Sequence, residues 1–514
     1  MSLAVVRSRA LVGMQAPEVR VEVHLGNGLP AFHIVGLPEA EVRESRDRVR
    51  AALLHTGFDF PNRRLTVNLA PADLPKESGR FDLPIAVGIL AASGQVPAEP
   101  LEAIEFVGEL SLTGSIRPIR GALAMALAVV RGERPPTLLL PAANGEEAAL
   151  VDGARLLGAV DLAGVAAHLA GASPLERIEA RPRAAAPPAG LDFRDVKGQA
   201  GAKRALEIAA AGAHNLLMVG PPGAGKSLLA QCLPTIQTPL TPEEALETAA
   251  LAGLAGPFEP ADWGRRPFRA PHHGASAAAI VGGGANPRPG EASLAHHGVL
   301  FLDELPEFGR AVLEALREPL ETGRIAIARA ARQVEFPARF QLVAAMNPCP
   351  CGYLGSERCR CTPEQVRRYQ ARLSGPLLDR IDLLITVHPV DEGQLMQRAD
   401  GEPSAAIAER VARARERQLA RQGRPNAFLS PPEIDRHCAL EAPAAALLRR
   451  VARQCHWSSR ALHRVQKLAR TIADLTGETA IGAQRVAEAA GYRRALDADT
   501  VARQSSETGR SARV

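Results

Sequence analysis

A glycine-rich loop that ends in lysine and serine is the part of this sequence whose chemistry can be read most directly. Residues 220–227 match the pattern GxxxxGK[ST]. In such a loop the glycines let backbone N–H groups turn inward around phosphate oxygens, the lysine neutralises phosphate charge, and the final hydroxyl binds Mg²⁺. The sequence therefore predicts an ATP and Mg²⁺ site formed by Gly220, Pro221, Pro222, Gly223, Ala224, Gly225, Lys226 and Ser227.

A second chemical signal is an acidic pair, Asp303 and Glu304, directly after the apolar run 299–302. Such a run is typical of a buried parallel strand, and its carboxyl end would lie beside the phosphate loop. There Asp303 would hold Mg²⁺ and Glu304 would activate the attacking water. The alternative is a strand that simply ends in acidic surface residues. The presence of the glycine loop in the same sequence disfavours this alternative.

An asparagine follows the next apolar run in a similar way. Residues 340–346 predict another buried strand, and Asn347 comes directly after it. Its amide could position water against the terminal phosphate, whereas an isolated asparagine at a strand end would be an ordinary turn residue. As the third polar group at successive strand ends, Asn347 is predicted to sense the nucleotide.

The elements that must position these groups form an α/β unit. A predicted helix at 199–211 and a predicted strand at 216–219 precede the glycine loop, whereas residues 405–421 and 432–492 show helical spacing. A stretch rich in Pro, Ala and Gly is expected to be a linker. The predicted parts are a first domain at 1–172, a linker at 173–190, an ATPase domain at 191–395, a helical lid at 396–498 and a flexible tail at 499–514.

The first domain shows mixed α/β signals of its own. Alternating apolar residues at 19–25 and the run at 32–35, separated by Gly26-Asn27-Gly28, predict two strands joined by a turn. Helical character covers 39–55, and further strands are predicted at 65–69 and 104–108.

Composition excludes several classes of protein. The 514 residues are 46% hydrophobic and 23% charged, which is ordinary for a globular chain, and the net charge of +5 is too mild to identify an anionic partner. The longest apolar run, 122–130, is too short to cross a bilayer. Without the pattern of a secretory signal, a cytoplasmic location with reduced thiols is expected, and no membrane partner.

Several short sequence motifs, taken together, resemble those of a known protein family. Residues 190–498 are similar to the magnesium-chelatase-type branch of the AAA+ ATPases, and residues 1–495 resemble the YifB/ComM proteins. The resemblance implies a hexameric ring that drives DNA branch migration in natural transformation. The words that carry it are those at residues 195–199, 268–273, 290–295, 344–352 and 374–382.

The resemblance also implies roles for two arginines. Arg380, in the word Leu-Leu-Asp-Arg-Ile-Asp, matches the arginine finger that reaches the nucleotide of a neighbouring subunit, which would make hydrolysis depend on assembly. Arg460, in Ser-Ser-Arg-Ala, matches a second sensor on the lid. From spacing alone, surface arginines in salt bridges would be the simpler interpretation.

Residues 321–340 predict a β-hairpin that presents Arg329 and Arg332 near its tip. In similar ring motors such hairpins contact the nucleic-acid backbone, which gives binding with little sequence preference. The alternative is an exposed hairpin with solvated arginines. Residues 268–284 resemble a second insertion of the family, and its adjacent His272 and His273 are assigned no chemistry.

Four of the seven cysteines fall within 13 positions, as two C-x-C pairs separated by seven residues. Four thiolates could hold a structural Zn²⁺ with no open coordination position. However, C-x-C is tighter than the usual C-x₂₋₄-C spacing, so plain thiols are the alternative. The candidate ligands are Cys349, Cys351, Cys359 and Cys361.

The first domain resembles the Lon protease domain, notably at residues 74–82 and 108–121. An active member needs a serine nucleophile beside a lysine base. At the matching positions this sequence has Arg80 and Leu123, whereas Ser78 and Lys76 stand elsewhere. A catalytically inactive domain that serves ring assembly, partner docking or substrate engagement is therefore expected.

The combined expectation is an α/β protein with a Lon-protease-like α/β domain, an AAA+ parallel-sheet domain and a helical lid bundle. It would use ATP and Mg²⁺ to move on branched or single-stranded DNA. Whether it also binds a structural Zn²⁺ is left open by the sequence. The ring is expected to be a homohexamer, whose assembly nucleotide or DNA could induce. Two alternatives stay open: a motor subunit for magnesium insertion into a porphyrin, and a protein-remodelling chaperone.

Overall fold

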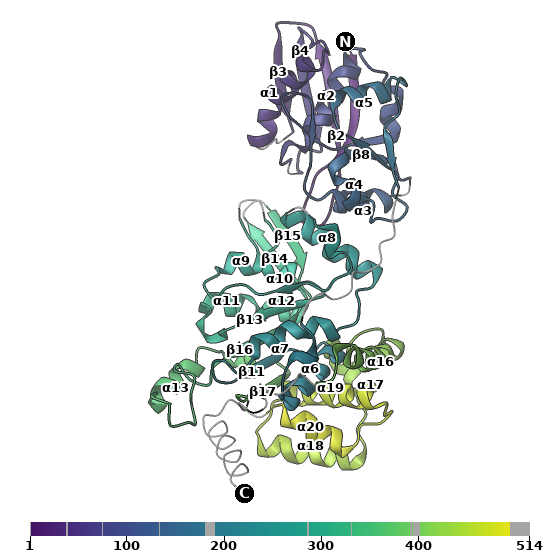
Figure 1. Ribbon diagram of the computed structural model, residues 1–514. Coiled ribbons are helices and arrows are strands. Elements are labelled where there is room, and N and C mark those ends of the chain that lie inside the picture. The colour runs from purple at the N-terminus through teal and green to yellow at the C-terminus, as the bar shows by residue number, and fades with distance from the viewer. Residues whose placement is uncertain are drawn as a thin grey trace. The chain divides into compact units, whose positions relative to one another are not determined.

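The computed structural model of the chain describes residues 2–36, 40–74, 76–132, 134–179, 191–256, 258–284, 287–329, 332–390, 393 and 401–493. It divides into two compact units (Figure 1). Unit 1 comprises the described part of Met1–Ala185 together with Thr241–Gly264 and Ala328–Phe336, and unit 2 comprises the remainder. Two segments from within the expected ATPase region of the sequence therefore pack as part of unit 1.

Unit 1 is built on a mixed sheet of eight strands in the order β10-β9-β8-β5-β1-β2-β4-β3. The strand β2 pairs antiparallel with β1 and β4, and β3 pairs parallel with β4. The strands are β1 (Ser2–Arg9), β2 (Glu18–Gly26), β3 (Ala31–Val35), β4 (Arg64–Ala70), β5 (Ile104–Phe106), β8 (Thr137–Pro141), β9 (Leu156–Ala159) and β10 (Glu176–Ile178).

This sheet differs in two details from what the sequence pattern predicts. The predicted strands at both sides of the turn at 26–28 exist, but they do not pair with one another, because β4 lies between them. In addition, residues 176–178 of the expected linker form β10, which pairs antiparallel with β9 at the sheet edge. Residues 180–190 of the expected linker lie outside the described residues.

The core of unit 1 lies between this sheet and its helices. Val19, Val21 and Val23 of β2 are fully buried, as their alternation predicts. The helix α2 is apolar on nearly every side, and Gly88 allows its close approach to β2, because a Cβ there would lie 2.5 Å from Val23 Cγ2. The helices of unit 1 are α1 (Ala40–His55), α2 (Asp82–Ala92), α3 (Ala122–Val130), α4 (Gly145–Ala148), α5 (Leu162–Leu169) and α8 (Pro242–Ala255), and a two-stranded sheet pairs β6 (Glu109–Leu110) with β7 (Ile116–Arg117).

Unit 2 contains the expected parallel sheet, in the order β12-β13-β16-β11-β17. All four neighbouring pairs are parallel. The strands are β11 (Leu216–Val219), β12 (Phe268–Arg269), β13 (Val299–Leu302), β16 (Gln341–Met346) and β17 (Leu383–Thr386). The helices outside the lid are α6 (Ala200–Gly212), α7 (Lys226–Cys232), α9 (Ala277–Val281), α10 (Glu291–Leu294), α11 (Arg310–Ala315), α12 (Arg317–Thr322), α13 (Pro363–Gln370) and α14 (Gly375–Leu378).

The C-terminal part of unit 2 is helical, as its periodicity predicts (Figure 1, green to yellow). One apolar core runs through the parallel sheet, α6 and this bundle. The bundle also contains buried polar groups, among them Asp474, which accepts hydrogen bonds from Arg421, Arg470 and Asn426. Its helices are α16 (Ser404–Gln422), α17 (Pro431–His437), α18 (Ala442–Gln454), α19 (Ser459–Thr476) and α20 (Ala483–Gly491).

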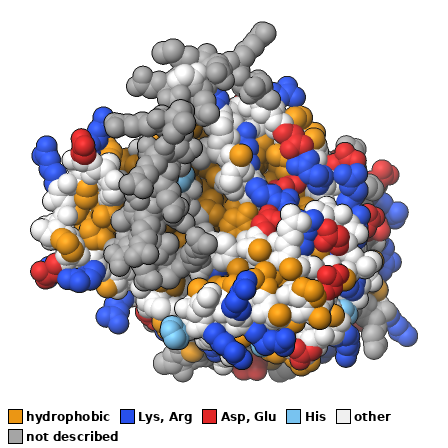
Figure 2. All heavy atoms as spheres, turned by 90° about the horizontal axis from the view of Figure 1, so that it is seen from below, with side chains coloured by type: hydrophobic (Ala, Val, Ile, Leu, Met, Phe, Trp, Pro, Cys, Tyr) orange, Lys and Arg blue, Asp and Glu red, His pale blue; other side chains and the backbone are white. Residues whose placement is uncertain are grey.

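The surface carries charges of both signs. On the face drawn in Figure 2, Lys and Arg side chains are interspersed with Asp and Glu side chains. None of the helices in the described part of the chain has the length and apolar character needed to span a bilayer.

Candidate functional site

The phosphate-binding loop has the backbone that the motif predicts. It leaves β11 after Val219 and enters α7 at Lys226. Gly223 and Gly225 have φ values of 77° and 86°, the left-handed region that favours glycine, and a Cβ at either would meet no atom within 4 Å. The loop therefore offers both the conformation and the open space that a phosphate group needs.

Lys226 is held at the centre of this loop. Its Nζ donates hydrogen bonds to the carbonyl oxygens of Gly220 and Pro221, at 2.7 and 2.9 Å, and to Asn347 Oδ1 at 3.2 Å. Burial lowers the pKa of Lys226, although the negative charge of the acidic pair opposes that shift. The predicted phosphate-binding lysine and the predicted sensor amide thus meet in space.

The two candidate Mg²⁺ ligands also meet. The strands β11, β16 and β13 lie side by side with Val219 opposite Met346 and Leu302 opposite Ala344, so their carboxyl ends share one edge of the sheet. At that edge Ser227 Oγ donates a hydrogen bond to Asp303 Oδ2 at 2.7 Å. A hydroxyl beside a carboxylate fits Mg²⁺, which prefers oxygen ligands.

Glu304 lies beside this edge in an unusual backbone conformation. Its φ is 52°, which is uncommon for a residue other than glycine, and its N–H donates to Asp303 Oδ1 at 2.9 Å. The Glu304 side chain is 53% exposed, and its Oε2 lies 3.2 Å from His273 Nδ1. Uncommon backbone conformations of this kind occur often at functional sites, and the catalytic role of Glu304 stays a prediction.

Sequence reasoning missed two residues near this site. His273 was assigned no role from the sequence. The only signal that could have pointed to it was its position in the family motif at residues 268–273. Gln199 was likewise noted only as part of the family motif at residues 195–199. Its Nε2 donates hydrogen bonds to Ala224 O in the phosphate-binding loop, at 3.2 Å, and to His388 O, at 2.6 Å. These contacts join segments far apart in sequence, so no local spacing announces them.

The two predicted arginines do not join this cluster within the single chain. Arg380 has a 10% exposed side chain that pairs with Glu321 and donates to Pro376 O at 2.7 Å. Its buried Nε has no hydrogen-bond partner among the described residues. Arg460 is exposed in the first turn of α19. The roles of both arginines in nucleotide hydrolysis stay predictions.

The predicted hairpin exists as β14 (Arg324–Arg329) paired with β15 (Arg332–Pro337). Its inward positions are buried, among them Val334 and Phe336, and Val334 Cγ1 lies 2.9 Å from where a Cβ of Gly13 would stand. The side chains of Arg329 and Arg332 lie outside what the structure describes, so their contact with DNA stays a prediction.

The four clustered cysteines come together, with all four sulfur atoms within 4.8 Å of one another. This arrangement is compatible with a bound metal ion, and the role of the four cysteines as zinc ligands stays a prediction. Cys232, Cys438 and Cys455 do not belong to this group of sulfur atoms, and none of the seven cysteines forms a disulfide. Burial raises the pKa of the Cys438 thiol to about 12, which fits a small buried apolar residue.

In unit 1 the serine and lysine near the Lon-like word have separate partners. Lys76 is fully buried and its Nζ donates to Pro71 O, whereas Ser78 Oγ accepts from Arg80 Nε at 2.9 Å. Leu123 is buried in the apolar core. These contacts fit an inactive domain, which stays the expectation.

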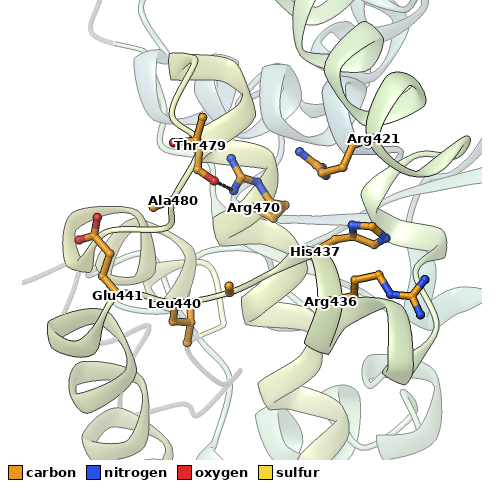
Figure 3. A pocket seen from close by; sticks show the side chains of 9 residues that line it. Arg421, Arg436, His437, Leu440, Glu441, Arg470, Thr479 and Ala480 are labelled. Atoms are coloured by element: carbon orange, nitrogen blue, oxygen red, sulfur yellow. Dashed lines mark hydrogen bonds between the residues drawn. The ribbon is translucent and has the colours of Figure 1, made fainter.

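The helical lid contains a pocket with several cationic side chains in its lining (Figure 3). It is lined in part by Arg421, Arg436, His437 and Arg470, and Arg470 Nη1 donates to the Thr479 carbonyl at 2.7 Å. Arg421 and Arg470 also pair with a buried carboxylate of α19. Because those two cations are already neutralised, we assign this pocket no ligand.

Comparison with known proteins agrees with the geometry. Three family models match: "Magnesium chelatase, subunit ChlI" at residues 192–395, "Subunit ChlI of Mg-chelatase" at 21–144, and "Magnesium chelatase, subunit ChlI C-terminal" at 401–493. The competence protein ComM of Haemophilus influenzae is 51% identical over 96% of this chain and 98% of its own length. The uncharacterised YifB proteins of Salmonella typhimurium and Escherichia coli are 50% and 49% identical, each over 96% of this chain and 97% of their own lengths. With such identity over nearly its whole length, the chain belongs to the YifB/ComM family of magnesium-chelatase-like AAA+ proteins.

Proposed function

We propose that this protein is an ATP-hydrolysing ring motor that acts on DNA, in recombination or natural transformation. The observation that supports hydrolysis best is the meeting of Lys226, Ser227, Asp303 and Asn347 at one edge of the parallel sheet. Support for DNA comes from the competence protein among the relatives and from the hairpin that carries Arg329 and Arg332 near its turn.

In the proposed mechanism each residue has one task. The loop N–H groups and Lys226 bind the phosphates, and Ser227 and Asp303 would hold Mg²⁺, which supplies charge neutralisation at the transferring phosphate. Glu304 accepts a proton from the attacking water, and the Asn347 amide orients that water. The Arg380 guanidinium, given by a neighbouring subunit, would stabilise charge at the transferring phosphate, which requires release from Glu321.

DNA strand displacement on a synthetic branched junction tests the class. Wild type with ATP should separate the strands, and Glu304→Gln should bind ATP and the junction but separate nothing. ATPase activity should rise with branched, single-stranded or duplex DNA. If no DNA stimulates turnover while basal ATP hydrolysis persists, a metal-insertion or protein-remodelling motor becomes the better interpretation.

Paired variants test the hairpin contact. Charge reversal of Arg329 and Arg332 to glutamate should abolish stimulation by DNA and spare basal turnover. The matched control reverses Arg449 and Arg453, which are both exposed on α18. Equal effects of the two double variants would contradict a role for the hairpin.

Mixed assemblies test hydrolysis in trans. Lys226→Ala and Arg380→Ala subunits should each be inactive alone, because one lacks the phosphate ligand and the other the finger. A mixture should regain turnover where an Arg380→Ala site receives the finger of a Lys226→Ala neighbour. A mixture that stays inactive while forming the same oligomer would contradict the finger.

A further inference from the structure

The four-cysteine cluster has the dimensions of a metal site. The sulfur atoms of Cys349 and Cys351 lie 3.4 Å apart, those of Cys349 and Cys359 3.9 Å, and those of Cys351 and Cys359 3.7 Å. In a tetrahedron of thiolates with Zn–S bonds of about 2.3 Å, the edges are about 3.8 Å. The three separations scatter around that value.

These separations do not fit the competing arrangements of thiols. A disulfide would bring two sulfurs to about 2.05 Å, and all four cysteines are free. Unrelated thiols have no reason to converge to such an array from two tight C-x-C pairs. The nearly equal spacing therefore points to one central ion.

The surroundings of the cluster favour negative charge. The exposed Arg358 and Arg360 flank Cys359 in sequence. Four thiolates around Zn²⁺ carry a net charge of −2, which these guanidinium groups can offset.

The cluster also closes a loop that begins at the nucleotide site. Cys349 stands two residues after Asn347, and Thr362, directly after the last cysteine, caps α13 by accepting from Gln365 N at 3.3 Å. The end of α13 returns to the start of this loop, because Gln370 Nε2 donates to Pro348 O at 3.2 Å.

The loop is packed against the phosphate-binding loop. Gly352 has a φ of 85°, and a Cβ there would lie 2.6 Å from Pro222 Cδ. Arg372, two residues beyond α13, donates to Pro306 O at 3.2 Å and pairs with Glu307, just after the acidic pair. An ion that holds this loop in place would therefore also hold Asn347 in position beside the phosphate-binding loop.

We propose that Cys349, Cys351, Cys359 and Cys361 bind one structural Zn²⁺ that holds the loop after Asn347 against the phosphate-binding loop. Binding deprotonates four thiols, so one Zn²⁺ displaces four protons and forms four Zn–S bonds without any redox change. With four protein ligands no position is open for water or substrate, so the ion has no direct part in the chemistry.

Metal analysis of the full-length protein tests the ion without reference to activity. Protein purified without chelator should contain one zinc per chain by elemental analysis. Replacement by Co²⁺ should give the strong visible absorption of tetrahedral cobalt thiolate. The double variant Cys359→Ser/Cys361→Ser should lose the zinc, whereas Cys361→His, which restores a ligand, should keep it. The control Cys455→Ser, at an exposed cysteine outside the cluster, should keep the full metal content.

The positioning effect rests on the proposed ATPase function and has its own readout. The Cys359→Ser/Cys361→Ser variant should bind a fluorescent ATP analogue near normally but turn it over about tenfold more slowly, as expected for a displaced orienting amide. If that variant does not fold, Cys361→His and the wild-type metal content still decide the assignment.

Several results would overturn the proposal. The metal site would be rejected if wild-type protein contained no metal even after refolding with zinc, or contained iron in place of zinc. It would also be rejected if thiol titration revealed a disulfide among the four cysteines, or if the double variant retained its full zinc content. Full zinc with no ATP hydrolysis would leave the metal site standing and reject the proposed function instead. Full zinc in wild type, with unchanged turnover in the zinc-free variant, would reject only the positioning of Asn347.

Discussion

Two residues after β13, Glu304 combines an uncommon backbone conformation with a histidine partner, His273. His273 Nδ1 lies 3.2 Å from Glu304 Oε2. The His272 ring lies against the His273 ring in a tilted arrangement, with ring centroids 4.1 Å apart, which helps to fix the imidazole. We infer that His273 positions the Glu304 carboxylate for the water-activating role that the proposed function gives it.

His273→Ala should therefore lower kcat for ATP about tenfold, equivalent to about 1.4 kcal/mol of transition-state stabilisation. The KM for ATP should change little, because the phosphate ligands are intact. Steady-state ATPase kinetics measures both, with His33→Ala, an exposed histidine of unit 1, as control. Wild-type kcat in His273→Ala would reject the positioning role.

Among the elements, the lid helix α19 depends on one buried carboxylate. Asp474 is 1% exposed and accepts hydrogen bonds from Arg421, Arg470 and Asn426, and Arg470 is itself only 2% exposed. Removing one member of a buried ion pair leaves the other charge uncompensated. The network thus makes the lid stable only while it is complete.

Asp474→Ala should lower the free energy of unfolding by about 3–5 kcal/mol. Chemical denaturation followed by circular dichroism measures the change. The matched control is Asp435→Ala on α17, where the carboxylate is exposed, and should cost little. A loss below about 1 kcal/mol would mean that the arginines find other partners.

A second buried network joins the lid to the parallel-sheet part of unit 2. His214 lies 3.3 Å from Asp382 Oδ2 and 2.8 Å from Thr471 Oγ1, and Arg464 also pairs with Asp382. Complete burial lowers the pKa of His214 below its ordinary 6.5, against the opposing effect of Asp382. The pKa of Asp382 is lowered despite burial, because Arg464 and His214 stabilise its carboxylate.

The sign of the resulting pH dependence follows from these shifts. Below pH 6.5 the unfolded chain protonates His214 while the folded chain does not, so stability should fall as pH falls, with a limiting slope of about 1.4 kcal/mol per pH unit. The Asp382 contribution is lost only below its ordinary pKa of 3.8. Thermal unfolding from pH 8 to 5 measures the first effect, and His214→Gln should flatten the curve. An equal slope in that variant would assign the effect to other groups.

At the scale of the whole molecule, the order of the chain and the division into units do not coincide. The helix α8 comes from within the expected ATPase region, yet Ala249 and Ala250 are buried in the same apolar cluster as residues of α3. The Gly121 N–H also donates to Gly253 O at 3.2 Å. Unit 1 is therefore completed by a segment that the chain supplies only after the phosphate-binding loop.

Ala249→Glu should consequently destabilise unit 1 by several kcal/mol, because a charge would replace a buried methyl group without a partner. Limited proteolysis should then cleave within residues 2–179 faster than in wild type. Glu243→Gln, at an exposed position of the same helix, should leave the cleavage rate unchanged. Unchanged proteolysis in Ala249→Glu would contradict the structural role of α8.

Much of the fold follows from local pattern. The strands β2, β4, β11, β13 and β16 and the helices α1, α6 and α16 lie where periodicity predicts them, because alternation and apolar runs directly record burial. The pairing of β3 with β4 and the edge strand β10 could not be read in this way, because sheet order depends on contacts between distant segments.

The amino-acid sequence by itself determined the phosphate-binding loop, the acidic pair and the family, because each is carried by contiguous residues whose chemistry does not depend on distant partners. Only the tertiary structure decided that Lys226 meets Asn347, that His273 approaches Glu304, that four cysteines form one cluster, and that α8 completes unit 1. The contacts of Lys226, His273 and α8 join segments that are distant in sequence, and the free energy that brings such segments together belongs to the whole chain rather than to any local motif.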